Sequence, residues 1–312
     1  MTVPAWTPEI VVDADRARTL IRARFPQMRA ERLERLGQGW DNAAYLVDGE
    51  TVFRFPQRAV AAPLIEIEIA VLPPLATELP LAIPVPRWVG EPDDEYPWRF
   101  AGYALLPGTP LDIARPGVEA RAALARPLAR FLRALHATGP DRFLAAGLPP
   151  DRIGRLDPAK RAPQAHARVS SLVRAGALSA GRASALLEVF ERDAPGTVTA
   201  RLTVVHGDLY ARHLLLDEAR ALTAVIDWGD VHLGDPAVDL SVAHELFTAP
   251  DLAAFLDEYG TIDAKTWRSA RWRAIHHAIL VADYGLVIGD DPLAQSGLDA
   301  IERILAHGHV LP

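Results

Sequence analysis

Alternation of apolar and polar residues marks the first third of the chain. Segments 33–36, 43–47 and 51–55 alternate with a period of two, which predicts three strands. Asp48-Gly49 separates the second and third strands and predicts a type I′ turn, because both central residues of that turn need positive φ. Segments 88–90 and 100–106 are two further strand candidates. The first third is therefore predicted to be rich in strands.

Helical spacing appears before and within this strand-rich part. Segment 13–25 is predicted to be a helix that Asp13 caps and Pro26 ends. Segment 64–79 is predicted to be mostly helical, with an interruption at Pro73-Pro74.

The rest of the chain is predicted to be mainly helical. Pro107-Gly108-Thr109-Pro110 is a predicted hinge, after which helices are expected at 121–137, 183–193, 267–288 and 298–306. Short apolar runs predict buried strands at 203–205, 214–216 and 224–226. A strand-rich part followed by a helical part is an α+β arrangement.

Composition narrows the class of protein. The 312 residues carry a formal charge of −7, which argues against a general nucleic-acid binder. Because cysteine is absent, disulfides, thiolate metal sites and thiol chemistry are excluded. We see no signal peptide and no apolar stretch long enough to span a bilayer. The chain is expected to be cytoplasmic, without a nucleic-acid or membrane partner, and its oligomeric state is left open.

The segment from Val204 to Leu240 carries the candidate chemistry. Asp208 follows one predicted strand, His213 lies five residues on, and Asp227 follows another strand. Phosphoryl transfer needs a carboxylate that orients and deprotonates the attacking hydroxyl, oxygen ligands for Mg²⁺, and positive charge on the phosphates. Asp208 can be the base and Asp227 the main metal ligand, although an aspartate such as Asp208, taken by itself, is more often a turn residue.

Three motifs in this segment resemble those of the aminoglycoside and macrolide phosphotransferases. The motifs are His206-Gly207-Asp208-Leu209, Ile226-Asp227-Trp228 and Gly234-Asp235-Pro236-Ala237-Val238-Asp239. The resemblance extends from about Gly37 to Leu240. It implies a bilobal protein-kinase-like fold, with a small β-rich N-terminal lobe over residues 1–106. A larger helical lobe over residues 107–312 would carry the catalytic loop and the acceptor site.

The resemblance also implies roles for single residues. Asp208 would be the catalytic base, and Asp227 would bridge Mg²⁺ to the nucleotide phosphates. His206 would support the metal-binding loop through hydrogen bonds, and Asp239 would accept backbone amides of the catalytic loop. His213 stands where most members have Asn, whereas the macrolide-type kinases resemble this sequence in having His there. It is a second metal neighbour, a donor to phosphate, or a structural histidine.

The nucleotide would bind to the first lobe. Gly37 and Gly39 lie between two strands, where a kinase folds a glycine-rich loop over the phosphates, but the third glycine is missing. Arg54 would contact phosphate, which arginine can hold in a bidentate way. Its partner on the next helix would be Glu68, with Glu66 as the fallback.

A hinge strand would complete the nucleotide site. The backbone of Tyr103, Leu105 and Leu106 would pair with the purine of ATP or GTP, which the sequence does not distinguish.

Other polar and aromatic residues are given ordinary roles. Adjacent residues on a helix point about 100° apart, so His276 and His277 are not expected to share a metal ion and are placed at the helix surface and core edge. A set at helical spacing is expected in the core, namely Trp267, Trp272 and Tyr284. A solvated face is the default for a set of acidic residues, namely Asp230, Glu245, Asp257, Glu258 and Asp283.

The sequence thus predicts a small-molecule kinase whose acceptor is an aminoglycoside, a macrolide or a metabolic compound such as a sugar or an amino alcohol. A protein kinase is disfavoured because Gly234-Asp235-Pro236 follows Asp227 too soon for a long activation segment. A nucleotide-binding pseudoenzyme is the alternative. His213 and the incomplete glycine loop favour it, whereas intact Asp208 and Asp227 oppose it.

Overall fold

The computed structural model describes residues 7–36, 42–144, 146–196 and 202–306. The chain divides into two compact units. The first comprises residues 1–77, 82–107 and 227–230, and the second comprises residues 78–81, 108–226 and 231–312. Two short segments, 78–81 and 227–230, therefore belong to a different unit from their neighbours in sequence.

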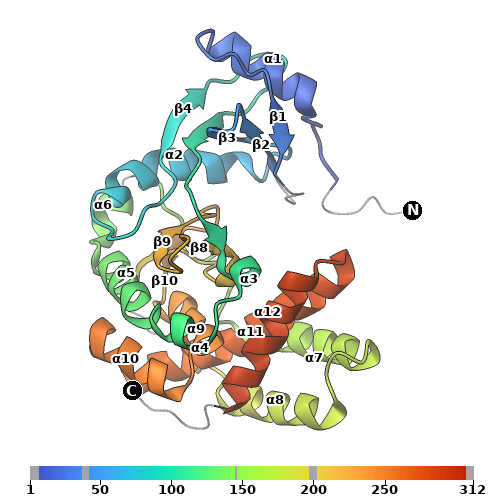
Figure 1. The fold of residues 1–312 in the computed structure, drawn as a ribbon, viewed down its shortest axis with the longest axis vertical. Coiled ribbons are helices and arrows are strands. Elements are labelled where there is room, and N and C mark those ends of the chain that lie inside the picture. Colours follow the sequence, from blue (N-terminus) through green and yellow to red (C-terminus); the bar gives the residue numbers. More distant parts are fainter. Residues whose placement is uncertain (1–6, 37–41, 145, 197–201, 307–312) are drawn as a thin grey trace. The chain divides into compact units, whose positions relative to one another are not determined.

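The first unit contains a five-stranded antiparallel sheet in the order β1-β2-β3-β5-β4 (Figure 1). Its elements are α1 (Ala14–Arg24), β1 (Leu33–Arg35), β2 (Asn42–Val47), β3 (Thr51–Pro56), α2 (Ala62–Ala76), β4 (Pro86–Gly90) and β5 (Phe100–Ala104). The predicted turn between β2 and β3 is confirmed, because Asp48 and Gly49 have φ of 51° and 79°.

An aromatic core holds this sheet and α1 together. Phe53 and Phe55 of β3 are fully buried and stack with ring centroids 6.2 Å apart, and both pack near Phe100 of β5. Leu20 and Ile21 of α1 belong to the same cluster. The predicted cap of α1 is confirmed, since the Asp13 carboxylate accepts a hydrogen bond of 2.8 Å from the backbone N–H of Arg16.

Helix α2 differs from the prediction, because it is not interrupted at Pro73-Pro74 but continues to Ala76. Both prolines lie in its last turn. Each lacks the N–H that would bond the carbonyl four residues earlier, and α2 ends two residues after Pro74.

The second unit is mainly helical, with two small sheets that pair β10 with β7 and β6 with β8 and β9. Its first elements are β6 (Thr109–Pro110), α3 (Leu111–Ala114), α4 (Val118–Ala122), α5 (Ala125–Ala137), α6 (Pro140–Leu144), α7 (Pro158–Arg174) and α8 (Ala180–Arg192). These are followed by β7 (Thr203–Val205), the 3-10 helix η1 (Ala211–His213), β8 (Leu214–Leu216), β9 (Leu222–Val225) and β10 (His232–Gly234). The last are α9 (Ala237–Leu246), α10 (Ala249–Tyr259), α11 (Ala264–Ile288) and α12 (Asp291–Ala306).

The single helix predicted over 121–137 is wrong, because the structure breaks it into α4 and α5 at Ala123-Leu124. Pro127 explains the break, since it lacks an N–H to bond the carbonyl of Ala123 and lies in the first turn of α5, where a proline needs no such bond. Helix α7, which contains Pro163, and strand β10 were not predicted.

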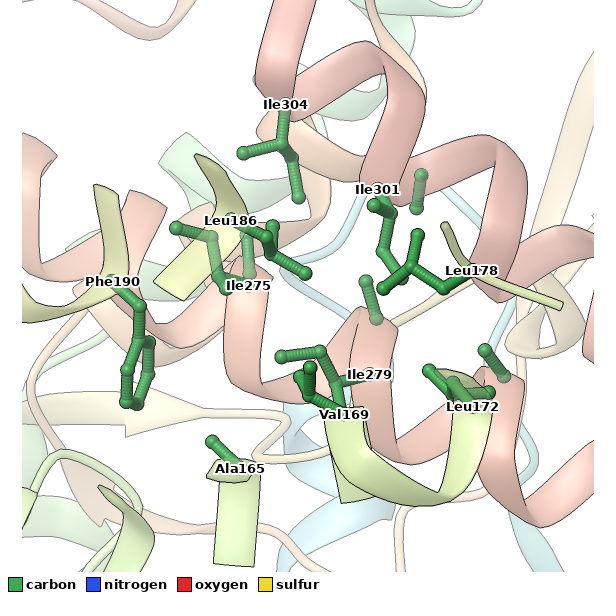
Figure 2. Packing of buried hydrophobic residues seen from close by; sticks show 14 of the residues in the cluster. Ala165, Val169, Leu172, Leu178, Leu186, Phe190, Ile275, Ile279, Ile301 and Ile304 are labelled. Carbon is green, nitrogen blue, oxygen red and sulfur yellow. The ribbon is translucent and has the colours of Figure 1, made fainter. Parts of the chain in front are cut away.

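Helices α7, α8, α11 and α12 share a hydrophobic core in the second unit. Figure 2 shows Val169 and Leu172 of α7 close to Ile279 of α11, with Ile301 and Ile304 of α12 nearby. Full burial of one such side chain contributes about 1.5–3 kcal/mol.

Aromatic residues of α11 belong to the core, as predicted. Trp272 is fully buried and stacks on Phe190 of α8, with ring centroids 4.9 Å apart and an interplanar angle of 12°. Trp267 is also buried, and Tyr284 is half-buried. Among the described helices, none combines the length and the hydrophobicity needed to cross a membrane.

Candidate active site

The loop after β7 carries Asp208 and is held by Asp239 in the first turn of α9. The two carboxylate oxygens of Asp239 accept hydrogen bonds from the backbone N–H groups of His206 (2.7 Å) and Gly207 (2.9 Å). The ring of His136 on α5 lies 3.3 Å from the same carboxylate. Burial alone would raise the pKa of Asp239, but the His136 hydrogen bond and charge, together with the amides, lower it. Asp239 therefore fixes the loop as an ionised group.

His206 joins this loop to the end of the next hairpin. Its Nε2 lies 3.0 Å from the carbonyl oxygen of Ile226, and its Nδ1 accepts from the backbone N–H of Asp208 at 3.3 Å. These contacts define a neutral ring with the proton on Nε2, and burial lowers the pKa of His206 accordingly. Ile226 directly precedes Asp227, so His206 restrains the chain at that position.

The Asp208 carboxylate meets a charged histidine of α11. His277 Nε2 lies 3.5 Å from Asp208 Oδ1, and His277 Nδ1 lies 3.0 Å from Glu245 Oε1 on α9. Burial alone would lower the pKa of His277, but the Glu245 charge and the hydrogen bonds to both carboxylates raise it to about 9. His277 is therefore protonated at neutral pH and bridges two carboxylates.

Asp208 is held ionised by these neighbours. Burial alone would raise its pKa, but the hydrogen bond and charge of His277, with smaller effects of His213 and Arg273, hold the pKa of Asp208 well below its usual range. The side chain is 34% exposed, so it can be reached by a ligand.

The structure corrects two expectations about this region. His276 and His277 do not lie at a helix surface, since each is only 2% exposed. A solvated face is also wrong for Glu245 and Asp283, which are buried and paired with His277 and Arg168 respectively. Sequence reasoning missed His277 as a site residue, because only the packing of α11 against α9 and the catalytic loop brings it to Asp208.

His213 lies in η1 and is buried. Its Nδ1 lies 2.7 Å from the carbonyl oxygen of Asp208, and its backbone carbonyl accepts from the N–H of Ile226 at 2.9 Å. The ring of Tyr210 packs edge-on against the His213 ring, with centroids 4.3 Å apart, and also against the His277 ring, with centroids 5.0 Å apart. The contact with a carbonyl assigns the proton to Nδ1, so that nitrogen is a donor and not a metal ligand.

A second group of predicted residues meets within the first unit. Arg54 of β3 projects from the opposite side of the strand to Phe53 and Phe55, and its Nη1 lies 2.9 Å from Glu68 Oε1 of α2. Tyr103 of β5 donates to Glu68 Oε2 at 2.7 Å. Glu66 pairs with Arg99 instead. Burial raises the pKa of Glu68, although Arg54 and Tyr103 oppose this effect.

Asp227, which is distant in sequence from Arg54, also lies close to it. Its Oδ1 lies 3.5 Å from Arg54 Nη2, and its side chain is about half exposed. The backbone of Asp227 is left-handed, with φ of 63°, a conformation that non-glycine residues adopt at a cost of about 1–3 kcal/mol. Arg54 thus presents its guanidinium between Glu68, which is buried, and Asp227, which is accessible.

Protein ligands alone do not form a complete metal cage. Among the described residues, no group of three or more His, Asp or Glu side chains could hold a metal ion. Mg²⁺ usually binds one or two carboxylates and completes its shell with water and substrate phosphates. The exposed carboxylate of Asp227 fits that requirement.

The remaining residues predicted to bind the nucleotide are the glycines of the loop and the segment from Tyr103 to Leu106. Gly37 and Gly39 lie outside the described residues. The backbone N–H of Leu105 donates to the carbonyl of Glu50 at 2.8 Å, so this amide is already engaged. Purine pairing by the segment from Tyr103 to Leu106 stays a prediction.

The fold and a match to a protein family define the class of this chain. Residues 32–273 match the family described as "Phosphotransferase enzyme family", so the chain belongs to that family. It is 32% identical to viomycin phosphotransferase of Streptomyces vinaceus over 152 residues, 47% of this chain and 50% of that protein. The chain thus matches no more than about half the length of the curated relatives it resembles in sequence.

Solved structures extend the similarity to nearly the whole chain. The GDP and kanamycin complex of APH(2″)-IIia is 25% identical, with a TM-score of 0.65 over 93% of this chain and 98% of that one. Macrolide 2′-phosphotransferase type I is 22% identical, with a TM-score of 0.56 over 94% and 98% of the two chains. The predicted α+β, protein-kinase-like fold is confirmed.

Proposed function

We propose that this chain transfers the γ-phosphoryl group of ATP or GTP to a hydroxyl group of a small molecule. The observation that carries the proposal is the Asp208 loop. Asp239 and His206 hold the backbone of this loop, and His277 lies against the accessible, ionised carboxylate of Asp208. A carboxylate in such a position can accept the proton of an acceptor hydroxyl as the phosphoryl group moves in line.

The lowered pKa of Asp208 indicates its role in the proposed reaction. Its lowered pKa makes it a weak proton acceptor, whereas an efficient general base titrates near the working pH. Phosphoryl transfer depends mainly on positioning and electrostatics, so a hydroxyl can be oriented by Asp208 and give up its proton late in the reaction. Asp208 therefore acts as an orienting base.

The donor nucleotide would be held by Arg54 and Asp227. Arg54 offers a guanidinium to the phosphates, and Glu68 fixes its position. Asp227 and phosphate oxygens would hold Mg²⁺, which supplies charge neutralisation when it is bound. The GDP bound in one related structure supports a nucleotide donor. The proposed setting is the cytoplasm, where nucleoside triphosphates are available.

The acceptor is a small hydroxyl compound, in this proposal an antibiotic or a metabolite. A related structure contains kanamycin, and another relative is named for viomycin, which supports the antibiotic class. A sugar or amino alcohol of metabolism is the alternative. A pseudoenzyme is disfavoured because Asp208 and Asp227 are both present and three hydrogen bonds hold the Asp208 loop.

An acceptor screen that measures ADP and GDP release together tests the proposal. The wild-type chain with Mg²⁺ is expected to release one of these products, and Asp208→Asn is expected to reduce turnover by about 10²–10⁴-fold. Glu218→Gln, which changes an exposed carboxylate in the turn after β8, serves as the matched control. Nucleotide binding without turnover of any acceptor, or full activity in Asp208→Asn, would contradict the proposal.

A further inference from the structure

A buried arginine lies one helical turn from the residue that contacts Asp208. Arg273 and His277 are four residues apart on α11, so they share a face with Cβ atoms about 5–6 Å apart. The Arg273 side chain is 7% exposed, and its Nε has no hydrogen-bond partner. Its Nη1 lies 3.4 Å from His276 Nδ1, at the limit of a hydrogen bond. His276 Nε2, also buried, has no partner either.

No carboxylate of the described residues forms an ion pair with this guanidinium, although Asp208 and Glu245 attract it over a longer distance. Across the described part of the chain, no acidic side chain lies within 4.0 Å of Arg273, while Asp208 and Glu245 both lie against His277. A buried guanidinium without an acidic partner is rare, because burial of an unpaired charge is costly. The protein keeps a desolvated cation beside its candidate base.

Charges of both signs act on Arg273, and two of them are the arginines Arg155 and Arg161. Arg161 of α7 hydrogen-bonds the carbonyls of Ile153 and Gly154 and the side chain of Gln164, none of which carries a charge. Burial lowers the pKa of Arg273, and repulsion by Arg155 and Arg161 adds to the effect, against the attraction of Asp208 and Glu245. The pKa of His276 is lowered to about 2 by burial and by Arg273. An anion placed here would relieve this repulsion.

We propose that Arg273 binds an anionic group, a carboxylate or a phosphate, on the acceptor, and so selects hydroxyl compounds that carry negative charge over polycationic ones. The inference rests on the proposed function for its assignment of Asp208 as the group that meets the acceptor hydroxyl. The short spacing along α11 requires the anion and the reacting hydroxyl to belong to one compact molecule. An ammonium-rich antibiotic would instead bring cations toward an unpaired guanidinium.

Calorimetric binding of four probes tests this inference without turnover. The probes are glucose, gluconate, glucose 6-phosphate and kanamycin, titrated at one ionic strength without nucleotide. At least one of the two anionic probes is expected to bind the wild-type chain about tenfold or more tightly than glucose. Which one binds distinguishes a carboxylate from a phosphate. Equal affinity for glucose, or tighter binding of kanamycin, overturns the inference.

Two substitutions on α11 connect the preference to Arg273. Arg273→Met is expected to abolish the anion preference and, because it removes an unpaired buried charge, to leave the urea midpoint unchanged or higher. Arg268→Gln, an exposed position on the same helix, is expected to behave like wild type. Loss of folding in Arg273→Met would show a structural role and overturn the inference, as would an anion preference that survives the change.

Product release separates this inference from the proposed function. Anion binding that depends on Arg273 but is never followed by ADP or GDP release would refute the kinase proposal and leave the anion site standing. Release that occurs only with glucose or kanamycin would leave the kinase proposal standing and refute the anion site.

Discussion

Replacement of His277 by glutamine tests the charge bridge between α11, α9 and the catalytic loop. His277 contacts Asp208 and Glu245 and is almost fully buried. A pKa raised from 6.5 to about 9 corresponds to about 3 kcal/mol of favourable interaction with the protonated ring, at about 1.4 kcal/mol per pH unit. His277→Gln is expected to lower the free energy of unfolding by about 3 kcal/mol at pH 6.5.

The stability that His277 contributes is expected to depend on pH. Because the pKa of His277 is raised in the folded state, its contribution is fully present below pH 6.5 and is lost as the pH rises through about 9. The difference in stability between wild type and His277→Gln should therefore shrink from pH 6.5 to pH 10.

Urea titrations at several pH values provide the assay. Tryptophan fluorescence reports on the region, since Trp267 and Trp272 lie on the same helix as His277. His166→Gln, which alters an exposed histidine of α7, is the control and should leave the midpoint unchanged. A loss below about 1 kcal/mol at pH 6.5, or a difference that grows with pH, would refute the reasoning.

Two further substitutions probe the loop and the core. Asp239→Asn is expected to cost about 2–4 kcal/mol of stability and most of the activity. The amide has one accepting oxygen where the carboxylate offers two to the backbone, and unchanged urea midpoints would contradict this. Phe190→Ala is expected to lower the free energy of unfolding by about 3–5 kcal/mol, because it removes a fully buried ring stacked on Trp272. Urea denaturation measures this change, and a loss of less than about 1 kcal/mol would contradict the place of the ring in the core.

Local patterns explain which elements the sequence could predict. The β2–β3 hairpin and the start of α1 depend on residues next to them in sequence, namely the Asp48-Gly49 turn and the Asp13 cap. Helix ends near prolines were harder to predict. Pro127 breaks a periodic segment into two helices, whereas Pro73 and Pro74 do not break α2, because the effect of a proline depends on its position within the helix.

The sequence by itself was enough to identify the family of this protein, and it predicts the roles of Asp208 and Asp227. The motifs around Asp208 and Asp227 are contiguous, so their spacing could be read directly. The packing of α9 and α11 decided what surrounds Asp208, because His277 and Glu245 are distant in sequence from Asp208 and from each other. Tertiary structure likewise decided the surroundings of Arg273. The periodicity of α11 places it on a helix face, but only the packing shows that its Nε is buried without a hydrogen-bond partner and that no acidic side chain of the described residues pairs with it.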